Sequence, residues 1–337
     1  MTMRTQLKEV PVQEALGMRL AHDLTRIVPG SFKGRLFTKG HIVGQEDIPA
    51  LLDIGKAHIY VMELAEGELH EDDAALRMAS AHRGDNVTMG QPHEGKVALK
   101  ASIQGLAKID PLYVEEVNRL GEIALATIRG DRLVEAGGQL AATRVIPLVV
   151  PEEKVVRVEQ IAAQFRERYG RAPIEVKPLK PMRAGLITTG SEVFSGRIED
   201  RFGPAVRSKL EALGSSVAEQ ALVPDDRDEI VRKMLEYKAK EYDMIMLTGG
   251  MSVDPDDRTP GAIRAAGTDI VSYGTPMLPG SMLLVGYLDG TPVFGLPGCV
   301  MHDPFTSFDV LLPRVLAGET VHKEDITAMG YGGLHGC

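Results

Sequence analysis

The sequence contains no tryptophan and only two cysteines, Cys299 and Cys337. Two cysteines are too few for the disulfide framework of a secreted domain, and they fit a reducing compartment. Long hydrophobic runs are also absent: no apolar stretch approaches the roughly 18 residues of a membrane-spanning helix, and the N-terminus has no hydrophobic signal core. We therefore expect a cytoplasmic protein for which a membrane is not a partner.

Acidic residues outnumber basic residues in this sequence. Lys and Arg number 38 against 47 Asp and Glu, which gives a formal net charge of −9, and the positive residues form no basic cluster along the chain. Because nucleic acids need a concentrated basic surface, we expect no nucleic-acid partner. A small anion remains a possible ligand, since helix N-termini and loop amides bind anions without net positive charge.

The length of 337 residues predicts two or three domains, and a hydrophobic content of 44% is ordinary for a globular protein. Composition divides the chain into four parts. Residues 1–65 are expected to form an α+β subdomain, and residues 66–180 a mixed α+β region that ends in a Pro-rich linker at Pro173–Pro181. Residues 181–320 form the main domain, and residues 321–337 a flexible, glycine-rich tail.

In the first half, apolar periodicity predicts helices and short strands in mixed order. The expected helices are residues 46–55, 72–81, 111–127 and 152–169, and the expected strands are 35–38, 57–64 and 143–150. Six of the nine histidines fall in the first 93 residues: His22, His41, His58, His70, His82 and His93. Their spacing fits no metal signature, so we expect most of them to be surface histidines, with a metal-binding N-terminal module as the alternative.

Beyond Pro181, strands and helices alternate regularly. The expected strands are 183–188, 216–223, 244–247, 270–273, 282–286 and 292–295, and the expected helices are 203–213, 228–239, 259–266 and 302–316. Alternation of this kind predicts an α/β fold, with helices on both faces of a mostly parallel sheet in a three-layer α/β/α arrangement. Such folds bind ligands at the carboxyl ends of the strands.

The most informative stretch is Asp243–Thr259. An apolar run, Met244–Leu247, stops at Thr248-Gly249-Gly250, and three carboxylates follow at Asp254, Asp256 and Asp257. Paired glycines let the backbone approach a ligand and expose its N–H groups, while loop carboxylates hold Mg²⁺ or hydrogen-bond an amino-bearing heterocycle. The pattern favours a phosphorylated, nitrogen-rich small molecule. The alternative is a plain strand-to-helix turn with solvated acids.

Three further turns follow predicted strands of the same sheet. They are Thr188–Glu192, which leads to Asp200; Pro224-Asp225-Asp226; and Leu296-Pro297-Gly298-Cys299 before the last helix. Each motif alone is weak, because strand ends commonly carry Gly and Asp. Their joint order in one sheet predicts a single site.

The quoted turns carry a resemblance to a known family. Together with Gly196–Asp200 and Pro279-Gly280, they resemble in order and spacing the molybdopterin-binding domain shared by molybdopterin adenylyltransferases, molybdopterin molybdenumtransferases and gephyrin. The resemblance covers about residues 181–317. Fainter matches to the N-terminal region of the molybdenumtransferases are Ala15-Leu16-Gly17, Leu20–Asp23 and Lys39–Ile42.

This resemblance implies molybdopterin, free or adenylylated, as the ligand, with Mg²⁺ and molybdate as further cofactors. Glu192 and Asp200 would contact the pterin or a nucleotide. Asp225 or Asp226, together with Asp257, would hold Mg²⁺ or molybdate. The catalytic acids would be Asp257, Asp226 and Glu192. The residues expected around the cofactor are Thr189, Gly190, Ser191, Asp200, Thr248, Gly249, Gly250, Ser252, Pro279, Gly280, Pro297, Gly298 and Cys299. The resemblance also implies a homo-oligomer, with other cofactor-assembly proteins or molybdoenzymes as partners.

The sequence departs from the molybdenumtransferase pattern at several positions. Phe202 replaces the usual Asn, Ser281 replaces a Lys that would suit an oxyanion, and Cys299-Val300 replaces Asn-Pro. We also expect the further C-terminal domain of those enzymes to be missing, because the sequence ends soon after the last predicted helix. Loss of a cation at an anion site removes transition-state stabilisation, so these departures favour binding over catalysis.

Cys299 has two interpretations. At a helix N-terminus its thiol pKa should fall, which would place a thiolate near molybdenum; the structural alternative is a small residue chosen for fit.

Three functions follow from the sequence. By the resemblance, the first would be enzymatic action in molybdenum-cofactor assembly, by adenylyl chemistry or Mg²⁺-dependent molybdate insertion. Alternatively the protein carries or senses the cofactor without turnover, or it is an α/β enzyme acting on nicotinamide nucleotides.

Overall fold

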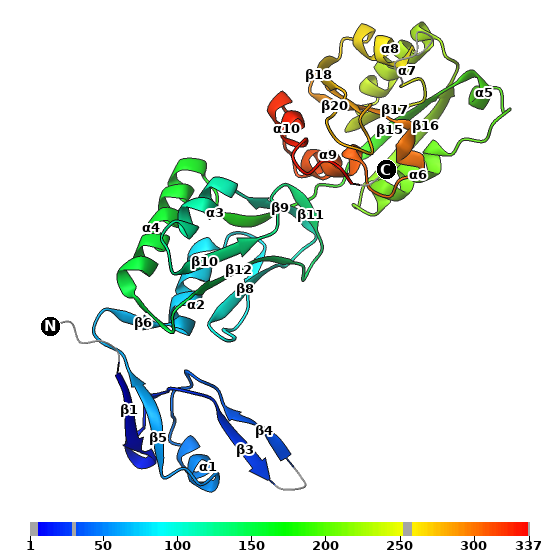
Figure 1. The fold of residues 1–337 in the computed structure, drawn as a ribbon. Helices are drawn as coiled ribbons and strands as arrows, with labels where there is room; N and C mark the ends of the chain where they lie inside the picture. Colours follow the sequence, from blue (N-terminus) through cyan, green and yellow to red (C-terminus); the bar gives the residue numbers. More distant parts are fainter. Residues whose placement is uncertain (1–5, 29–31, 252–257, 336–337) are drawn as a thin grey trace. The chain divides into compact units, whose positions relative to one another are not determined.

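The computed structural model describes residues 6–28, 32–251 and 258–335 (Figure 1). The chain divides into two compact units. Unit 1 comprises Met1–Ser102, Lys108–Gly130 and Ala136–Glu175, and unit 2 comprises Ile103–Ala107, Asp131–Glu135 and Val176–Cys337. In the described part of the chain, every helix is too short or too polar to cross a membrane.

The first part of unit 1 is a small α+β assembly. Its elements are β1 (Gln6–Pro11), the 3-10 helix η1 (Val12–Glu14), β2 (Arg19–Leu20), β3 (Leu24–Val28), β4 (Phe32–Phe37), α1 (Asp47–Asp53) and β5 (His58–Glu63). Strand β5 lies between β1 and β2 in an antiparallel sheet, and β3 pairs with β4. Leu20, Leu51 and Ile59 bury their side chains in a shared core, so this segment has its own hydrophobic interior.

The rest of unit 1 packs helices on a four-stranded antiparallel sheet, ordered β10-β12-β8-β7. Its elements are β6 (Glu68–His70), α2 (Glu71–His82), β7 (Val87–Met89), β8 (Lys96–Ala101), α3 (Pro111–Asn118), β10 (Ile123–Thr127), β12 (Gln139–Val145), β13 (Val149–Pro151) and α4 (Glu152–Tyr169). The predicted helix 152–169 is confirmed: Val155, Val158, Ile161, Ala162 and Phe165 form its buried stripe. Gly170, in the left-handed conformation, ends it.

Two expectations for this region are wrong. The helix predicted over 111–127 ends at Asn118, because Gly121 and Glu122 turn the chain with positive φ and Ile123–Thr127 pairs with β12 as a strand. The segment predicted as a linker contains β14 (Ile174–Pro178), which joins β9 (Gly105–Ile109) and β11 (Arg132–Val134) in a sheet. Ile174 and Val176 are buried there, so Pro173 and Pro181 flank a strand whose last residue is Pro178.

Unit 2 is built on a six-stranded sheet ordered β16-β15-β17-β20-β19-β18. Strands β15 (Arg183–Thr189), β16 (Ser216–Val223), β17 (Met244–Thr248) and β20 (Thr291–Leu296) are parallel. Strands β18 (Asp269–Tyr273) and β19 (Leu284–Leu288) complete the sheet in antiparallel orientation. All five residues of β17 are buried, as expected for a central parallel strand covered on both faces.

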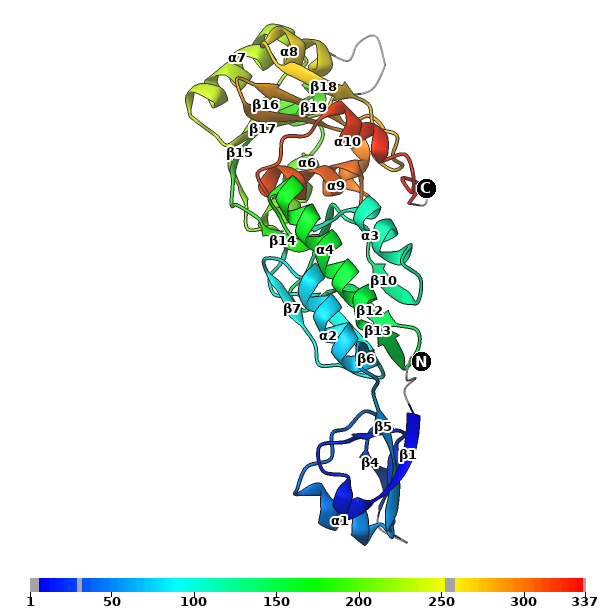
Figure 2. The same ribbon diagram turned by 90° about the vertical axis from the view of Figure 1, so that its left-hand side faces the viewer.

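Helices cover both faces of this sheet (Figures 1 and 2). On one face, α6 (Phe202–Glu211), α9 (Ser307–Leu316) and α10 (Lys323–Ala328) share a core with the sheet through Val206, Phe308 and Ile326. On the other, α7 (Arg227–Ala239) and α8 (Thr259–Ala265) share a second core through Ile230 and Ile263. The predicted α/β fold class is confirmed.

The C-terminal expectations need two corrections. The helix predicted over 302–316 splits into the 3-10 helix η2 (Gly298–Met301) and α9, because Pro304 interrupts it and Thr306 with Asp309 forms a capping box. Residues 321–328, expected in the flexible tail, include α10, and Val321 and Ile326 are buried in the core. Cys337 lies outside the described residues.

Candidate functional site

The four parallel strands of unit 2 end at one edge of the sheet, at Thr189, Val223, Thr248 and Leu296. The strand order places them as consecutive neighbours. With a spacing of ~4.8 Å between strands, the four ends span ~14 Å, the size of a small-molecule ligand. The four turns quoted from the sequence therefore lie along one edge, which we call the strand edge.

Two of the turns are joined by hydrogen bonds between β15 and β16. Ser191, the first residue of α5 (Ser191–Phe194), donates its backbone N–H to Asp225 Oδ2 over 3.1 Å. Gly190 donates its N–H to the Val223 carbonyl over 3.2 Å. Glu192 follows with an exposed side chain. Amides, a hydroxyl and carboxylates thus meet where these two strands end.

The turns after β15 and β17 are joined by buried threonine hydroxyls. Thr189 Oγ1 lies 3.2 Å from the Thr248 carbonyl and 3.1 Å from Thr259 Oγ1, and Thr259 in turn donates to the Gly249 carbonyl over 2.9 Å. All three threonines are at most 3% exposed. These contacts fix the backbone of Gly249, while Gly249 and Gly250 remain partly exposed.

Asp200 is partly exposed and hydrogen-bonded within the protein rather than left free in its loop. Its carboxylate accepts hydrogen bonds from the Phe202 and Gly203 amides at the start of α6 and from Gln220 Nε2, the last over 2.6 Å. Gln220 also bonds Thr188 Oγ1 over 3.0 Å. Asp200 therefore anchors the loop after α5 to β15 and β16, and its contact with a ligand stays a prediction.

Asp225 and Asp226, both expected to hold metal, have different partners. Asp226 Oδ1 accepts the Asp228 and Glu229 amides, each over 3.0 Å, and so caps α7. Asp225 faces the Ser191 amide. The described residues contain no group of three His, Cys, Asp or Glu that would hold a metal ion. Asp257 and Ser252 lie outside the described residues, so the predicted metal set is untested.

Pro279 and Gly280 lie in the connection between β18 and β19, and both are buried. The Gly280 carbonyl accepts hydrogen bonds from Ser307 Oγ over 2.7 Å and Thr275 Oγ1 over 3.0 Å. A side chain at Gly280 would overlap Ser307, so the position requires glycine. Leu284 pairs with Gly295 near the end of β20. The connection therefore packs beside the strand edge and supports it.

Pro297, Gly298 and Cys299 follow β20, with Gly298 exposed and Cys299 partly exposed. The expected fall in the Cys299 thiol pKa is wrong. Burial raises this pKa, and the carboxylate of Asp303 raises it further. Cys299 lies inside the four-residue 3-10 helix Gly298–Met301, and the amides of this short turn do not outweigh those two effects. Cys299 is therefore a protonated thiol at neutral pH.

Thr259 and Gln220 were not singled out from the sequence, although they connect the turns. A signal was present for each. Thr259 is the first residue of a helix and precedes Pro260, a residue that is typical of helix starts. Gln220 is an amide in the middle of a strand, which marks a polar contact across the sheet.

Comparison with known proteins places this edge in a family. Residues 185–317, which contain all four turns, match the family model described as "Probable molybdopterin binding domain". These residues belong to the molybdopterin-binding domain superfamily. Residues 9–63 match a different family, a domain of unknown function (DUF8806).

Two curated relatives and one solved structure show the extent of the likeness. The molybdopterin molybdenumtransferase of Staphylococcus aureus (strain COL) is 34% identical over 137 residues, which are 39% of this chain and 32% of that protein. A CinA-like protein of Mycobacterium sp. (strain JLS) is 33% identical over 90 residues, 26% of this chain and 21% of that protein. The molybdopterin biosynthesis enzyme MoaB from Thermus thermophilus is 25% identical, with a TM-score of 0.35 over 41% of this chain and 98% of that one. This chain thus spans about a third of the molybdenumtransferase.

Proposed function

We propose that the strand edge of this molybdopterin-binding domain binds molybdopterin, or a closely related phosphorylated pterin, in molybdenum-cofactor biosynthesis. The observation that carries the proposal is the joining of the turns. Hydrogen bonds connect three neighbouring strand ends into one polar surface. They join Ser191 to Asp225, and Thr189 to Thr248 and Thr259. The family match of residues 185–317 supports the choice of ligand.

The groups at this edge suit the two ends of such a ligand. The partly exposed Gly249 and Gly250 offer close backbone approach to a phosphate, and the Ser191 hydroxyl adds a donor. The ring amino group and neighbouring N–H of a pterin are donors, and the carboxylates of Glu192 and Asp225 are acceptors that match them.

Mg²⁺ fits Asp225 better than Asp226. Mg²⁺ is held by one or two carboxylates together with ligand phosphates, and Asp225 has a second carboxylate oxygen beyond the one bonded to Ser191. Asp226 is occupied as the cap of α7. A bound Mg²⁺ would neutralise negative charge on phosphate oxygens, with Asp225 as its ligand and Asp257 as the second carboxylate.

Binding without turnover is the second candidate, and Ser281 is the observation that favours it. A serine, partly exposed, stands where the resembled molybdenumtransferases usually carry a lysine. Without that cation, an oxyanion beside Gly280 would have less stabilisation. An assay of molybdate insertion with Mg²⁺ separates the two candidates, because only an enzyme would release product over many turnovers.

The binding proposal is tested by titrating the protein with molybdopterin and following pterin fluorescence. Asp225→Asn should weaken binding about tenfold or more, since a hydrogen bond to a charged group is lost. Asp289→Asn removes the same charge at the β19–β20 turn, at the opposite end of β20, and should change the affinity less than about twofold. Nicotinamide mononucleotide serves as the competing ligand. Equal affinity in both variants, or tighter binding of the mononucleotide, would contradict the proposal.

A further inference from the structure

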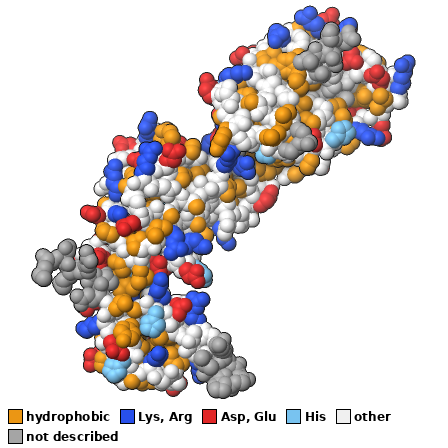
Figure 3. Space-filling model, viewed as in Figure 1, with side chains coloured by type: hydrophobic (Ala, Val, Ile, Leu, Met, Phe, Trp, Pro, Cys, Tyr) orange, Lys and Arg blue, Asp and Glu red, His pale blue; other side chains and the backbone are white. Residues whose placement is uncertain are grey.

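A hollow in unit 2 lies against helices α7 and α8. Its volume is about 490 Å³, and its lining residues are Arg227, Arg258, Gly261, Arg264 and Ala265. Three of these five residues are arginines, in a chain whose net charge is −9. On the face drawn in Figure 3, the described Lys and Arg side chains are mostly interspersed with Asp and Glu. Among the described residues that line the hollow, by contrast, the charged ones are all arginines.

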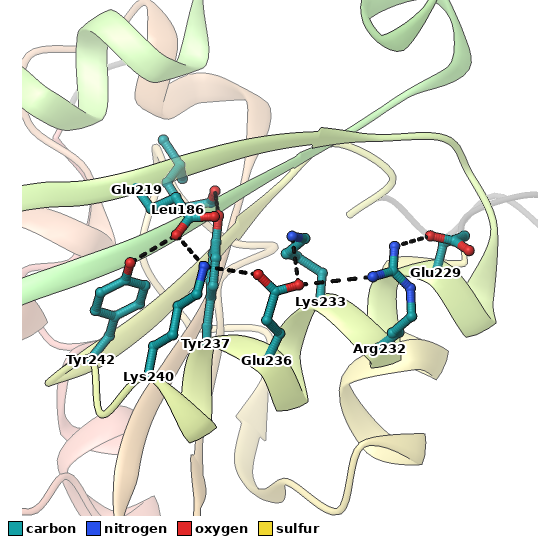
Figure 4. Close-up of polar contacts among 9 residues, drawn as sticks. All are labelled: Leu186, Glu219, Glu229, Arg232, Lys233, Glu236, Tyr237, Lys240 and Tyr242. Carbon is teal, nitrogen blue, oxygen red and sulfur yellow. Dashed lines mark hydrogen bonds and ion pairs between the residues drawn. The ribbon is translucent and has the colours of Figure 1, made fainter.

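None of these three guanidinium groups forms a salt bridge or hydrogen bond with a described residue. Two other arginines of unit 2, Arg232 and Arg314, are paired with carboxylates. Arg232, one turn along α7, pairs with Glu229 and Glu236 (Figure 4), and Arg314 pairs with Glu319 and Asp325. Like charges around one hollow repel each other, and an anion placed between them removes that repulsion.

The backbone that carries two of these arginines is firmly held. On α8, Ala262 and Ile263 are fully buried in the core shared with α7. Positions 258, 261, 264 and 265 follow helical spacing on the opposite, exposed side. Arg258 also precedes Thr259, whose hydroxyl bonds the Gly249 carbonyl. The arginines therefore project from a fixed scaffold.

Gly261 keeps the hollow open. It lies in the middle of α8, where glycine costs roughly 1 kcal/mol relative to alanine. A Cβ at this position would meet no atom within 4 Å, so packing does not require glycine there. The residue leaves room for a ligand beside the helix backbone.

We propose that this hollow binds a diphosphate group, either free as pyrophosphate or carried by a small molecule. Each guanidinium offers a planar pair of donors that matches two phosphate oxygens, and three guanidiniums balance the charge of a diphosphate. A volume of about 490 Å³ is in the range of small-molecule sites. The hollow binds this group whether or not a pterin occupies the strand edge.

Calorimetric titration of the full chain tests the proposal, with pyrophosphate, a nucleoside diphosphate, inorganic phosphate and sulfate as probes at fixed ionic strength. Pyrophosphate or the nucleoside diphosphate should bind at least about tenfold more tightly than sulfate, because a diphosphate offers more charge and more oxygen acceptors to the three arginines. Tighter binding of the nucleoside diphosphate than of pyrophosphate would identify a carried group as the source. Binding of sulfate as tight as that of pyrophosphate would overturn the proposal.

Two variants and a control locate the site. Arg264→Gln should weaken diphosphate binding about tenfold, whereas Arg232→Gln, which removes an already paired arginine on the neighbouring helix, should change it less than about twofold. Gly261→Leu should fill the hollow and abolish binding while the thermal midpoint stays the same or rises, since leucine favours the helix. Unchanged affinity in both Arg264→Gln and Gly261→Leu would overturn the assignment. Because no pterin is used, this result is independent of the strand-edge titration.

Discussion

Single residues show how the strand edge is assembled. Gly249 has a φ of +86°, which glycine adopts readily, and a Cβ there would overlap the Thr189 carbonyl oxygen. The sequence Thr248-Gly249-Gly250 predicts a turn after a strand, and that prediction is correct. It does not predict which backbone lies against the glycine, because Thr189 is distant in sequence and the contact depends on the order of strands.

Gly249→Ala should therefore destabilise unit 2 by about 2–4 kcal/mol, as a left-handed alanine is strained and its methyl group overlaps a backbone carbonyl. Gly214→Ala is the matched control: Gly214 has a φ of +73°, but a methyl group added there would have no atom within 4 Å. That variant should lose only about 1–2 kcal/mol. Urea unfolding measures the stability of both variants. Equal losses of unfolding free energy would show that the contact with Thr189 does not contribute to the cost.

For single helices, a regular spacing of apolar residues predicts the element correctly, whereas an interrupted spacing does not. The buried stripe of α4 identifies the helix from its sequence. In residues 111–127, apolar residues recur on both sides of Gly121, so the pattern predicts a single helix. In the structure, the Asn118 side chain bonds both the N–H and the carbonyl of Leu125, and this contact holds β10 beside the end of α3. A contact between a side chain and a later strand has no local signature.

Helices α2 and α3 meet at a buried pair that makes stability depend on pH. His82 is fully buried, its Nδ1 lies 2.6 Å from the Tyr113 hydroxyl, and burial lowers the His82 pKa from 6.5 to about 3, with Arg166 adding to the effect. The unfolded chain takes up this proton near pH 6.5, whereas the folded protein resists it until about pH 3. His82 thus lowers the free energy of unfolding below pH 6.5, and this destabilisation increases as the pH falls.

The free energy of unfolding of unit 1 should accordingly fall by up to about 1.4 kcal/mol per pH unit between roughly pH 6 and pH 4 from this group alone. His82→Gln keeps a polar partner for Tyr113 but does not titrate, so its unfolding energy should vary less with pH. His58→Gln, at an exposed histidine of the same unit, is the control and should keep the original slope. Denaturant unfolding across this pH range provides the measurement, and an unchanged slope in His82→Gln would rule out this source.

At the scale of the whole molecule, the alternation of strands and helices beyond Pro181 is enough to predict the α/β fold of unit 2. The antiparallel strands are less evident. Asp289-Gly290 between β19 and β20 is a sequence typical of a hairpin turn. The structure confirms that these two strands pair in antiparallel orientation. In unit 1, residues 9–63 match a domain of unknown function, and the sequence offers no chemistry specific enough to assign it one.

We propose that the turns after β15, β16 and β17 form one pterin-binding surface. A crystal structure of the protein with molybdopterin tests it most directly. We expect the phosphate beside Gly249 and Gly250 and the pterin ring within hydrogen-bond distance of Asp225 or Glu192. A pterin bound elsewhere on the protein, with the strand edge left to solvent, would contradict the account.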